Sequence, residues 1–438
     1  MRRASALLFV LCACADRDAD VTLRFWALGR EGEVVQQLIP EFERRNPGVR
    51  VQVQQIPWTA AHEKLLTAYV GNATPHVAQI GNTWVPEFVA LNALLPLDSV
   101  IAASTTVPRD DYFPGIWDTN VIDGAVYGLP WYVDTRVLFY RSDILREAGY
   151  ATVPATWTEW REAMRAIKRD VGPDRYAILL PTNEWPQPVL LGLQNGSPLL
   201  RDGGRYGSFR DPPFREAFSF YVDLYREGLA PAVSSNQVAN LYEEFARGLF
   251  AMYITGPWNV SEFSRRLPAT MEGRWATAPM PGPRAGEPGI SLAGGSSLVL
   301  FAGRGHDELA WRLVEYLSEP AQQIRFYELT NNLPARESAW QATGLADDQY
   351  TRAFYQQLHH VVATPKVPEW EQIATRTFEA VEEAVRSRRS VDEVLARLDR
   401  DVDGMLEKRR WLLARRARRD STASAPAPTQ PLIGAVRP

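Results

Sequence analysis

Two aromatic rings and two opposite charges stand together before a strand-forming run. The stretch GLPWYVDTRVLFY, residues 128–140, contains Trp131, Tyr132, Asp134 and Arg136. A core rarely contains such a mixture, because a buried charge costs free energy unless it is paired. Rings offer flat apolar faces, whereas a carboxylate accepts hydrogen bonds and a guanidinium donates them. The stretch therefore predicts a ligand site at the mouth of a buried strand.

The composition supplies many more rings and few other reactive groups. The chain has 438 residues, with 14 Trp, 16 Tyr and 17 Phe, and such rings can stack on sugar or base faces. The net charge of -4 gives no reason to expect a nucleic acid partner, which needs a concentrated positive patch. His359 and His360 are adjacent, so they would not face one site on a helix. We expect no metal and no cofactor.

The N-terminus predicts export. MRR is a short positive region, and ALLFVLCACA, residues 6–15, is apolar but too short to span a bilayer. Leu11-Cys12-Ala13-Cys14 resembles the lipobox of bacterial lipoproteins. We therefore expect residues 1–14 to be a signal peptide and Cys14 to carry a lipid anchor. The alternative is cleavage after the Ala-rich end, which would release a free secreted protein. In either case the mature domain has no disulfide.

The segments that position these residues alternate between strand and helix. Apolar or alternating runs at residues 21–28, 49–56 and 76–84 predict three strands with helices between them. This order is typical of a parallel sheet with helices on its faces. A second such region starts at residues 176–181 and includes the apolar strand pattern at 249–258. In the first helical segment, Pro40 predicts a kink or a late start.

Five motifs in a fixed order carry a resemblance to a known family. They are FERRNPGVRVQV, QIGNTWVPEF, GLPWYVDTRVLFYRSDIL, GLFAMYITGPWN, and GGSSLVLF followed by a helix and NNLPAR. Over nearly all of residues 21–412 the chain resembles the extracellular solute-binding proteins of bacterial ABC importers. Within these, it resembles the sugar-binding family that includes maltose- and trehalose-binding proteins.

The resemblance implies the two-lobed type II periplasmic-binding-protein fold, with α/β lobes, a ligand cleft between them and hinge closure. We expect residues 21–133 plus 257–330 to form the first lobe and 134–256 plus 331–412 the second. Residues 415–438 are basic and then rich in Ala and Pro, so we expect a disordered tail. A solvated end is favoured there over contact with an anionic membrane surface.

The function implied by the resemblance is transport reception. The chain would capture a sugar or oligosaccharide, such as the α-glucosides maltose or trehalose, by lobe closure and deliver it to an ABC permease. We expect a monomer on the periplasmic or cell-surface side of the cytoplasmic membrane, attached through Cys14. Two alternatives stay open. One is a glycoside hydrolase that uses cleft carboxylates, although no motif identifies a catalytic residue. The other is the same fold with glycerol phosphate or another polar metabolite as ligand.

The resemblance also places ligand contacts. A sugar presents an apolar C–H face and a rim of hydroxyls, so rings, carboxylates, amides and guanidinium groups suit it. The expected ligand-binding residues are Glu31, Asn82, Trp84, Trp131, Tyr132, Asp134, Trp258, Gly295, Ser296 and Arg336.

Several of these positions have a structural alternative. Glu31 would otherwise stabilise a helix dipole, Trp131 would pack at the hinge, and Arg336 would bridge the lobes. Family members often carry Asp where Gly81 stands and Trp where Ser296 stands, so one acceptor and one stacking face are expected to be missing. The remaining cleft-side tryptophans, at positions 58 and 185, are assigned to packing.

Overall fold

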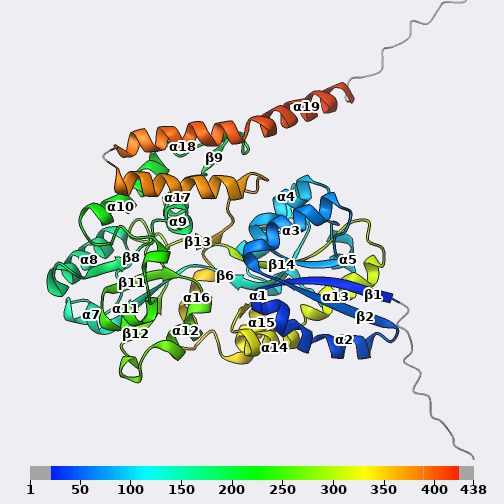
Figure 1. The fold of residues 1–438 in the computed structure, drawn as a ribbon, viewed down its shortest axis with the longest axis horizontal. Coiled ribbons are helices and arrows are strands. Elements are labelled where there is room, and N and C mark those ends of the chain that lie inside the picture. The colour runs from blue at the N-terminus through cyan, green and yellow to red at the C-terminus, as the bar shows by residue number, and fades with distance from the viewer. Residues whose placement is uncertain (1–20, 388, 424–438) are drawn as a thin grey trace, which may run out of the picture.

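Residues 21–387 and 389–423 are described by a computed structural model, and they form two α/β lobes side by side (Figure 1). Each lobe contains its own sheet, so the predicted two-lobed α/β fold is confirmed. The predicted signal peptide at 1–14, its Cys14 and residues 424–438 lie outside the described residues.

The first lobe contains a six-stranded sheet. In spatial order its strands are β15 (Leu333–Pro334), β6 (Leu129–Asp134), β14 (Gly294–Leu300), β3 (Val77–Gly81), β1 (Val21–Leu28) and β2 (Val49–Ile56). β1 lies parallel to β2 and β3, as the strand–helix–strand pattern predicts. β14 runs antiparallel to β3 and β6. Leu23, Phe25 and Ala27 of β1 are fully buried, because helices cover the parallel part of the sheet.

Helices surround this sheet: α1 (Gly29–Val34), α2 (Ile39–Arg45), α3 (Trp58–Val70), α4 (Val85–Ala90), α5 (Asp98–Ala103), α6 (Pro114–Asp118), α13 (Asp307–Leu317), α14 (Pro320–Thr330) and α15 (Glu337–Thr343). A 3-10 turn at Val35–Gln37 separates α1 from α2, and Pro40 lies in the first turn of α2. The predicted interruption at Pro40 is confirmed, because the first turn of a helix is where proline's missing N–H costs least.

The second lobe contains a four-stranded sheet, with β12 (Trp275–Ala278), β7 (Val137–Arg141), β11 (Phe250–Thr255) and β8 (Tyr176–Leu179) in spatial order. Its helices are α7 (Ser142–Glu147), α8 (Trp157–Val171), α9 (Pro186–Gln194), α10 (Pro212–Arg226), α11 (Leu241–Arg247), α12 (Trp258–Arg266) and α16 (Arg352–Leu358). The ring of Phe139 in β7 packs against Phe263 of α12 and Trp275 of β12, with centroids 5.0 and 5.9 Å away.

The chain crosses between the lobes three times, and one crossing matches the predicted boundary. β6 ends at Asp134 and β7 begins at Val137, so the chain changes lobes at the stretch of rings and charges. The prediction that residues 257–330 belong to the first lobe is wrong for their beginning. β12 pairs with β7, so the return crossing lies between Ala278 and Gly294.

The assignment of residues 331–412 to the second lobe is also wrong at its start. Leu333 of β15 lies opposite Val133 of β6, and α15 packs against α14, so both elements belong to the first lobe. The last crossing follows α15, because α16 packs against β7 and β12. Strand pairing decides these boundaries, and local sequence does not encode it.

Three short strand pairs complete the strands. They are β4 (Val121–Ile122) with β5 (Ala125–Val126), β9 (Leu200–Arg201) with β10 (Tyr206–Gly207), and β13 (Ser291–Leu292) with β16 (Val361–Val362). The last pair is parallel and joins the return crossing to the segment between α16 and α17.

Three C-terminal helices lie along one side of the molecule (Figure 1): α17 (Trp370–Arg386), α18 (Val391–Met405) and α19 (Glu407–Ala423). α17 and α18 form a hairpin that packs on α9 and α10 of the second lobe. The predicted disorder of residues 415–438 is wrong for 415–423, which continue α19 as a helix. Within the described chain, no helix combines the length and apolar character that crossing a membrane requires.

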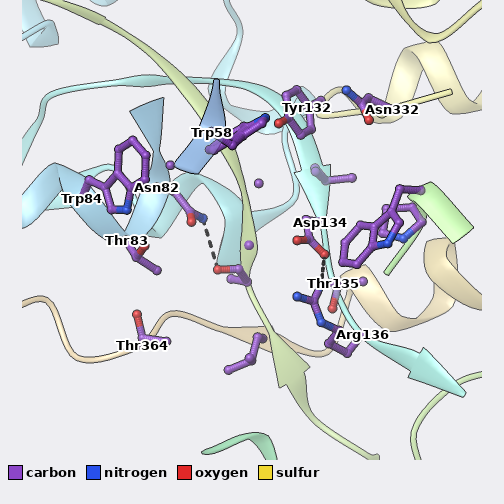
Figure 2. A pocket seen from close by; sticks show the side chains of 18 of the residues that line it. Trp58, Asn82, Thr83, Trp84, Tyr132, Asp134, Thr135, Arg136, Asn332 and Thr364 are labelled. Atoms are coloured by element: carbon purple, nitrogen blue, oxygen red, sulfur yellow. Dashed lines mark hydrogen bonds and ion pairs between the residues drawn. The ribbon is translucent and has the colours of Figure 1, made fainter. Parts of the chain in front are cut away.

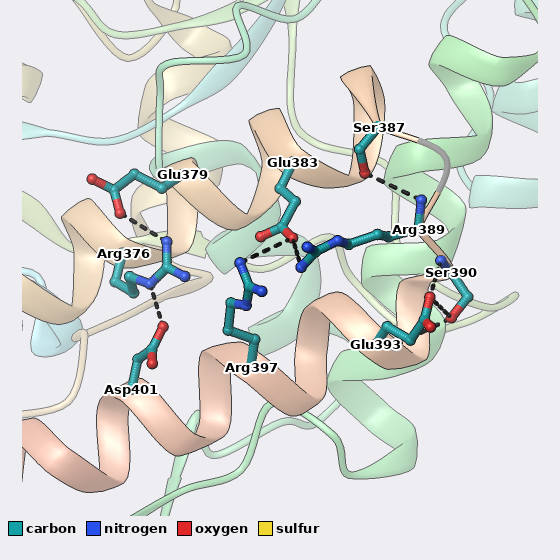
Figure 3. A network of polar contacts seen from close by, with 9 residues as sticks. All are labelled: Arg376, Glu379, Glu383, Ser387, Arg389, Ser390, Glu393, Arg397 and Asp401. Carbon is teal, nitrogen blue, oxygen red and sulfur yellow. Dashed lines mark hydrogen bonds and ion pairs between the residues drawn. The ribbon is translucent and has the colours of Figure 1, made fainter.

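Ion pairs fasten this hairpin, as Figure 3 shows. Arg376 of α17 donates to Asp401 of α18 at 2.6 Å, and Glu383 of α17 accepts from Arg389 at 2.7 Å and lies 3.4 Å from Arg397. The start of α18 is therefore tied to the end of α17 by charge as well as by packing.

Candidate functional site

A pocket of about 420 Å³ lies between the lobes, where the chain crosses from β6 to β7 (Figure 2). Both lobes and the crossing segments supply its walls. The lining residues are Glu31, Trp58, Gly81, Asn82, Thr83, Trp84, Tyr132, Val133, Asp134, Thr135, Arg136, Trp185, Pro257, Trp258, Leu292, Ala293, Gly294, Gly295, Asn332 and Thr364.

Glu31 forms a fixed acceptor in this pocket. It lies in α1 directly after β1, and its side chain is buried. Its Oε1 accepts from the Tyr132 hydroxyl at 3.0 Å and from the Asn332 amide at 3.1 Å, and its Oε2 accepts from Trp58 Nε1 at 3.4 Å. Burial, and then the charge of Glu31, hold the pKa of Tyr132 well above its usual value, so the phenol stays a neutral donor.

Asp134 is the second carboxylate of the pocket, and Arg136 controls its surroundings. The Arg136 guanidinium donates to Asp134 Oδ1 and also lies over the Trp258 ring, 4.6 Å from its centroid. Burial raises the pKa of Asp134, and the nearby Arg136 opposes that rise. One guanidinium therefore contacts both a hydrogen-bond acceptor and the ring that is best exposed for stacking, because Trp258 is 42% exposed.

Tryptophans of the first lobe form another wall. Trp58, at the start of α3, meets Trp84 edge to face with centroids 5.9 Å apart. The His62 ring lies 5.0 Å from that of Trp84, and His62 Nε2 contacts Glu87 at 2.6 Å. This hydrogen bond raises the pKa of His62. His62, held by Glu87, therefore packs against one side of the Trp84 ring and restricts its rotation.

Seven of the predicted site residues line the pocket together: Glu31, Asn82, Trp84, Tyr132, Asp134, Trp258 and Gly295. Glu31 and Trp84 follow strand ends of the first lobe, whereas Trp258 begins α12 of the second. Asn82 is buried and donates to the Ala293 carbonyl at 3.2 Å, so it also holds the crossing segment in place.

Trp131 and Ser296 do not line the pocket. Trp131 is 1% exposed and stacks on Phe326, with centroids 4.2 Å apart, which agrees with its packing alternative. Ser296 is buried and donates its hydroxyl to the Ile80 carbonyl at 3.0 Å. Core packing takes up the Trp131 ring. Ser296 lies directly opposite Tyr132 in the β14–β6 pair, but its hydroxyl is used by the Ile80 carbonyl and does not reach the pocket.

Arg336 does not line the pocket either, so its prediction as a ligand-binding residue is wrong. It is buried, and its guanidinium donates to Asp111 at 2.6 Å and to the carbonyls of Thr106 and Ser318 at 2.8 and 3.0 Å. These partners all belong to the first lobe, so its salt bridge does not cross between the lobes. The arginine holds β15 and α15 against that lobe.

The pocket includes residues for which sequence reasoning gave another role or none. Trp58 and Trp185 line it, although both were expected to serve packing. Arg136 belongs to the stretch that predicted a ligand site, although it was not among the expected ligand-binding residues. Asn332 lies within NNLPAR, so a closer reading of that motif could have found it. Thr364 had no signal, because the segment between β16 and α17 is brought to the site only by the tertiary structure.

The chemistry of the walls is that of recognition by stacking and hydrogen bonding. Trp58, Trp84, Trp185 and Trp258 offer rings, and Arg136 is the only Lys or Arg among the lining residues. Within the described residues, no group of three or more His, Cys, Asp or Glu side chains could hold a metal ion. A cleft at a chain crossing between two α/β lobes defines a two-lobed binding protein.

Comparison with known proteins names the family. Residues 26–324 match the family model described as bacterial extracellular solute-binding protein, and the chain belongs to that family. It is 52% identical to the sugar-binding protein MalE from the phytopathogen Xanthomonas citri, with a TM-score of 0.87 over 90% of this chain and 99% of that one.

More distant relatives cover most of the chain as well. The diacetylchitobiose binding protein DasA of Streptomyces coelicolor is 27% identical over 82% of this chain and 83% of its own length. The galactooligosaccharide-binding protein of Bacillus subtilis is 22% identical over 92% of this chain and 96% of its own length. The family resemblance inferred from the motifs is thus confirmed.

Proposed function

We propose that this protein captures a neutral sugar or oligosaccharide between its lobes and delivers it to the permease of an ABC importer. The observation that carries the proposal is the pocket itself, in which tryptophans from both lobes surround the acceptors Glu31 and Asp134. Rings bind the C–H face of a pyranose, and the carboxylates accept from its hydroxyls. A ligand that touches both lobes stabilises the closed arrangement.

The relatives support the same ligand class. Their names specify a sugar, diacetylchitobiose and galactooligosaccharide. Since these named ligands differ, we propose only the ligand class, a sugar, and leave the particular sugar to experiment. The first sugars to test are α-glucosides such as maltose and trehalose.

Binding without catalysis is part of the proposal. Glu31 accepts hydrogen bonds from three side chains, and Asp134 is paired with Arg136, so neither carboxyl resembles a free acid poised beside a free base. A phosphate ester is disfavoured as ligand, because the one lining cation is already paired and Arg336 lies outside the pocket. We therefore favour the receptor over both alternatives.

The N-terminal sequence supports a site of action outside the cytoplasmic membrane. We propose that Cys14 is lipidated and that the monomeric receptor works outside the cytoplasmic membrane, where it meets its permease. Labelling with a radioactive fatty acid in a bacterial host should mark the wild-type chain and leave Cys14→Ser unmarked. Equal labelling of both would contradict the anchor.

A thermal-shift screen of the full chain tests the ligand class. The panel contains monosaccharides, α- and β-linked oligosaccharides and glycerol phosphates. We expect a sugar to raise the midpoint, because a ligand at about 100 times its Kd adds about 2.7 kcal/mol to folding stability. Product analysis of the same mixtures should show intact sugar. A shift with phosphate esters alone, or hydrolysis that Asp134→Asn abolishes, would contradict the proposal.

A further inference from the structure

The last described helix, α19, exposes one face that combines cations with large apolar side chains. Lys408, Trp411, Leu412 and Arg415 have the spacing i, i+3, i+4 and i+7, so they lie on one side of the helix. All four are exposed, and Trp411 and Leu412 are 58% and 48% exposed. We call these four residues the outer face of α19.

The other side of α19 holds the helix to the protein. Arg409 Nε donates to the Gly204 carbonyl at 3.1 Å, and Arg410 Nη1 donates to the Arg205 carbonyl at 3.0 Å. Both acceptors lie in the turn between β9 and β10 of the second lobe. Because this side is fastened, the outer face is directed away from the two lobes.

From its attachment, α19 runs outward beyond the α17–α18 hairpin (Figure 1). Arg416 lies 3.8 Å from Asp123, in the turn between β4 and β5 of the first lobe. The helix therefore contacts both lobes and lies along one side of the molecule.

Both charged side chains of the outer face are positive. Lys408 and Arg415 flank the two apolar side chains, and the Arg415 guanidinium lies 5.3 Å from the centroid of the Trp411 ring. A partner for this face must be anionic and must also accept a tryptophan and a leucine.

We propose that the outer face of α19 docks on the anionic surface of a phospholipid bilayer. Long cationic side chains reach phosphate groups, Trp prefers the membrane–water interface, and Leu enters the acyl boundary. An acidic protein would have to supply a pocket for Trp411, whereas a bilayer accepts the ring without one. The contact is separate from sugar capture and would set how the receptor lies against the membrane.

Vesicle sedimentation tests the proposal with the full chain carrying Cys14→Ser, so that no acyl anchor contributes. The vesicles contain either phosphatidylcholine alone or phosphatidylcholine with about 30 mol% phosphatidylglycerol. We expect binding to the anionic vesicles that weakens as salt rises from about 0.05 M to about 0.5 M. The variant Lys408→Gln/Arg415→Gln should bind about 30-fold more weakly, because each cation near the surface contributes about fivefold.

The matched control removes the same charge elsewhere. Arg226→Gln/Arg312→Gln changes two arginines that are about half-exposed and should bind like the parent. A second variant, Trp411→Ser/Leu412→Ser, should lose binding while keeping every cation. Equal loss in the control, equal binding to both vesicle types, or no binding to anionic vesicles at low salt would each overturn the proposal. The last outcome would leave an acidic protein surface as the partner chemistry.

Discussion

At the scale of single residues, Arg136 contacts two of the expected ligand-binding side chains at once. Its guanidinium pairs with Asp134 and covers part of Trp258, so the two best ligand candidates are both occupied by one side chain. A sugar that stacks on Trp258 must compete with Arg136 for the ring. The ion pair thus keeps the partly buried carboxylate compensated until a ligand hydroxyl arrives.

Replacement of Trp258 by Ala should weaken sugar binding. If the ring stacks on the ligand, its loss costs about 1–3 kcal/mol, as for stacked bases, or about 10- to 100-fold in affinity. Isothermal titration calorimetry with the ligand found in the screen measures this change. Trp411→Ala removes an exposed tryptophan that does not line the pocket and serves as the control. Unchanged affinity in Trp258→Ala would show that the ring is not a ligand contact.

Sugar affinity should fall on acidification through Asp134. Burial raises the pKa of this carboxyl above its usual range, so the folded protein takes up the proton at a higher pH than an exposed aspartate would. The protonated form loses charge-assisted acceptance from ligand hydroxyls and its pairing with Arg136. Titration calorimetry from about pH 7 to about pH 4 should show this loss in the wild type.

The same pH series on Asp134→Asn supplies the control. The amide cannot titrate, so affinity should be lower near neutral pH and nearly independent of pH over the same range. A variant whose affinity falls with acid as steeply as the wild type would assign the titration to another group.

Between elements, an arginine clamp joins α8 to the residue that follows α10. Arg165 of α8 donates to both carboxylate oxygens of Glu227, at 2.7 and 3.0 Å, and Arg161 donates to the same carboxylate. These arginines lower the pKa of Glu227 to about 2. Such a bidentate pair joins α8, which packs on β8, to the end of α10, which packs on α9, α17 and α18.

Glu227→Gln should lower the free energy of unfolding by about 1–3 kcal/mol near neutral pH, the usual range for hydrogen bonds to charged groups. Because the folded-state pKa is lowered, the stabilisation is present above the ordinary glutamate pKa and is lost as the pH falls toward about 2. Urea unfolding of both proteins at several pH values should therefore show a difference that shrinks with acid.

Glu162→Gln is the matched control for this clamp. Glu162 contacts the same Arg165 but is 53% exposed, so its removal should change stability by less than about 1 kcal/mol. A larger effect from Glu162 than from Glu227 would refute the role of burial in the clamp.

At the scale of the whole molecule, the crossings that line the pocket also connect the lobes. Thr83 beside the pocket donates to Glu371 of α17 at 2.6 Å, and Lys366 lies 2.7 Å from Asp118 of the first lobe. Polar contacts of a few residues therefore join the lobes beside the ligand site, where hinge closure would bring the lobes together.

Ligand binding should make the protein more compact. A sugar that contacts tryptophans of both lobes favours the closed arrangement by its differential affinity. Small-angle X-ray scattering should show a smaller radius of gyration with saturating ligand, and a non-binding sugar provides the control. An unchanged radius at full occupancy would contradict lobe closure.

The sequence by itself determined the local elements and much of the site. The alternation in β2 and the apolar run of β1 follow from side-chain pattern, and the helix break follows from Pro40. Tyr132 and Asp134 could be expected in the pocket because rings and charges rarely share a core. These features depend on neighbours in the chain, which a sequence displays directly.

Only the tertiary structure decided which residues face each other. Trp131 and Ser296 carry suitable chemistry, but Trp131 packs on Phe326 and the Ser296 hydroxyl donates to the Ile80 carbonyl, whereas Trp58 and Trp185 reach the pocket from separate lobes. The lobe boundaries and the buried salt bridge of Arg336 depend on strand pairing and packing across long stretches of chain. Such contacts are set by the free energy of the assembled core, and no local pattern records them.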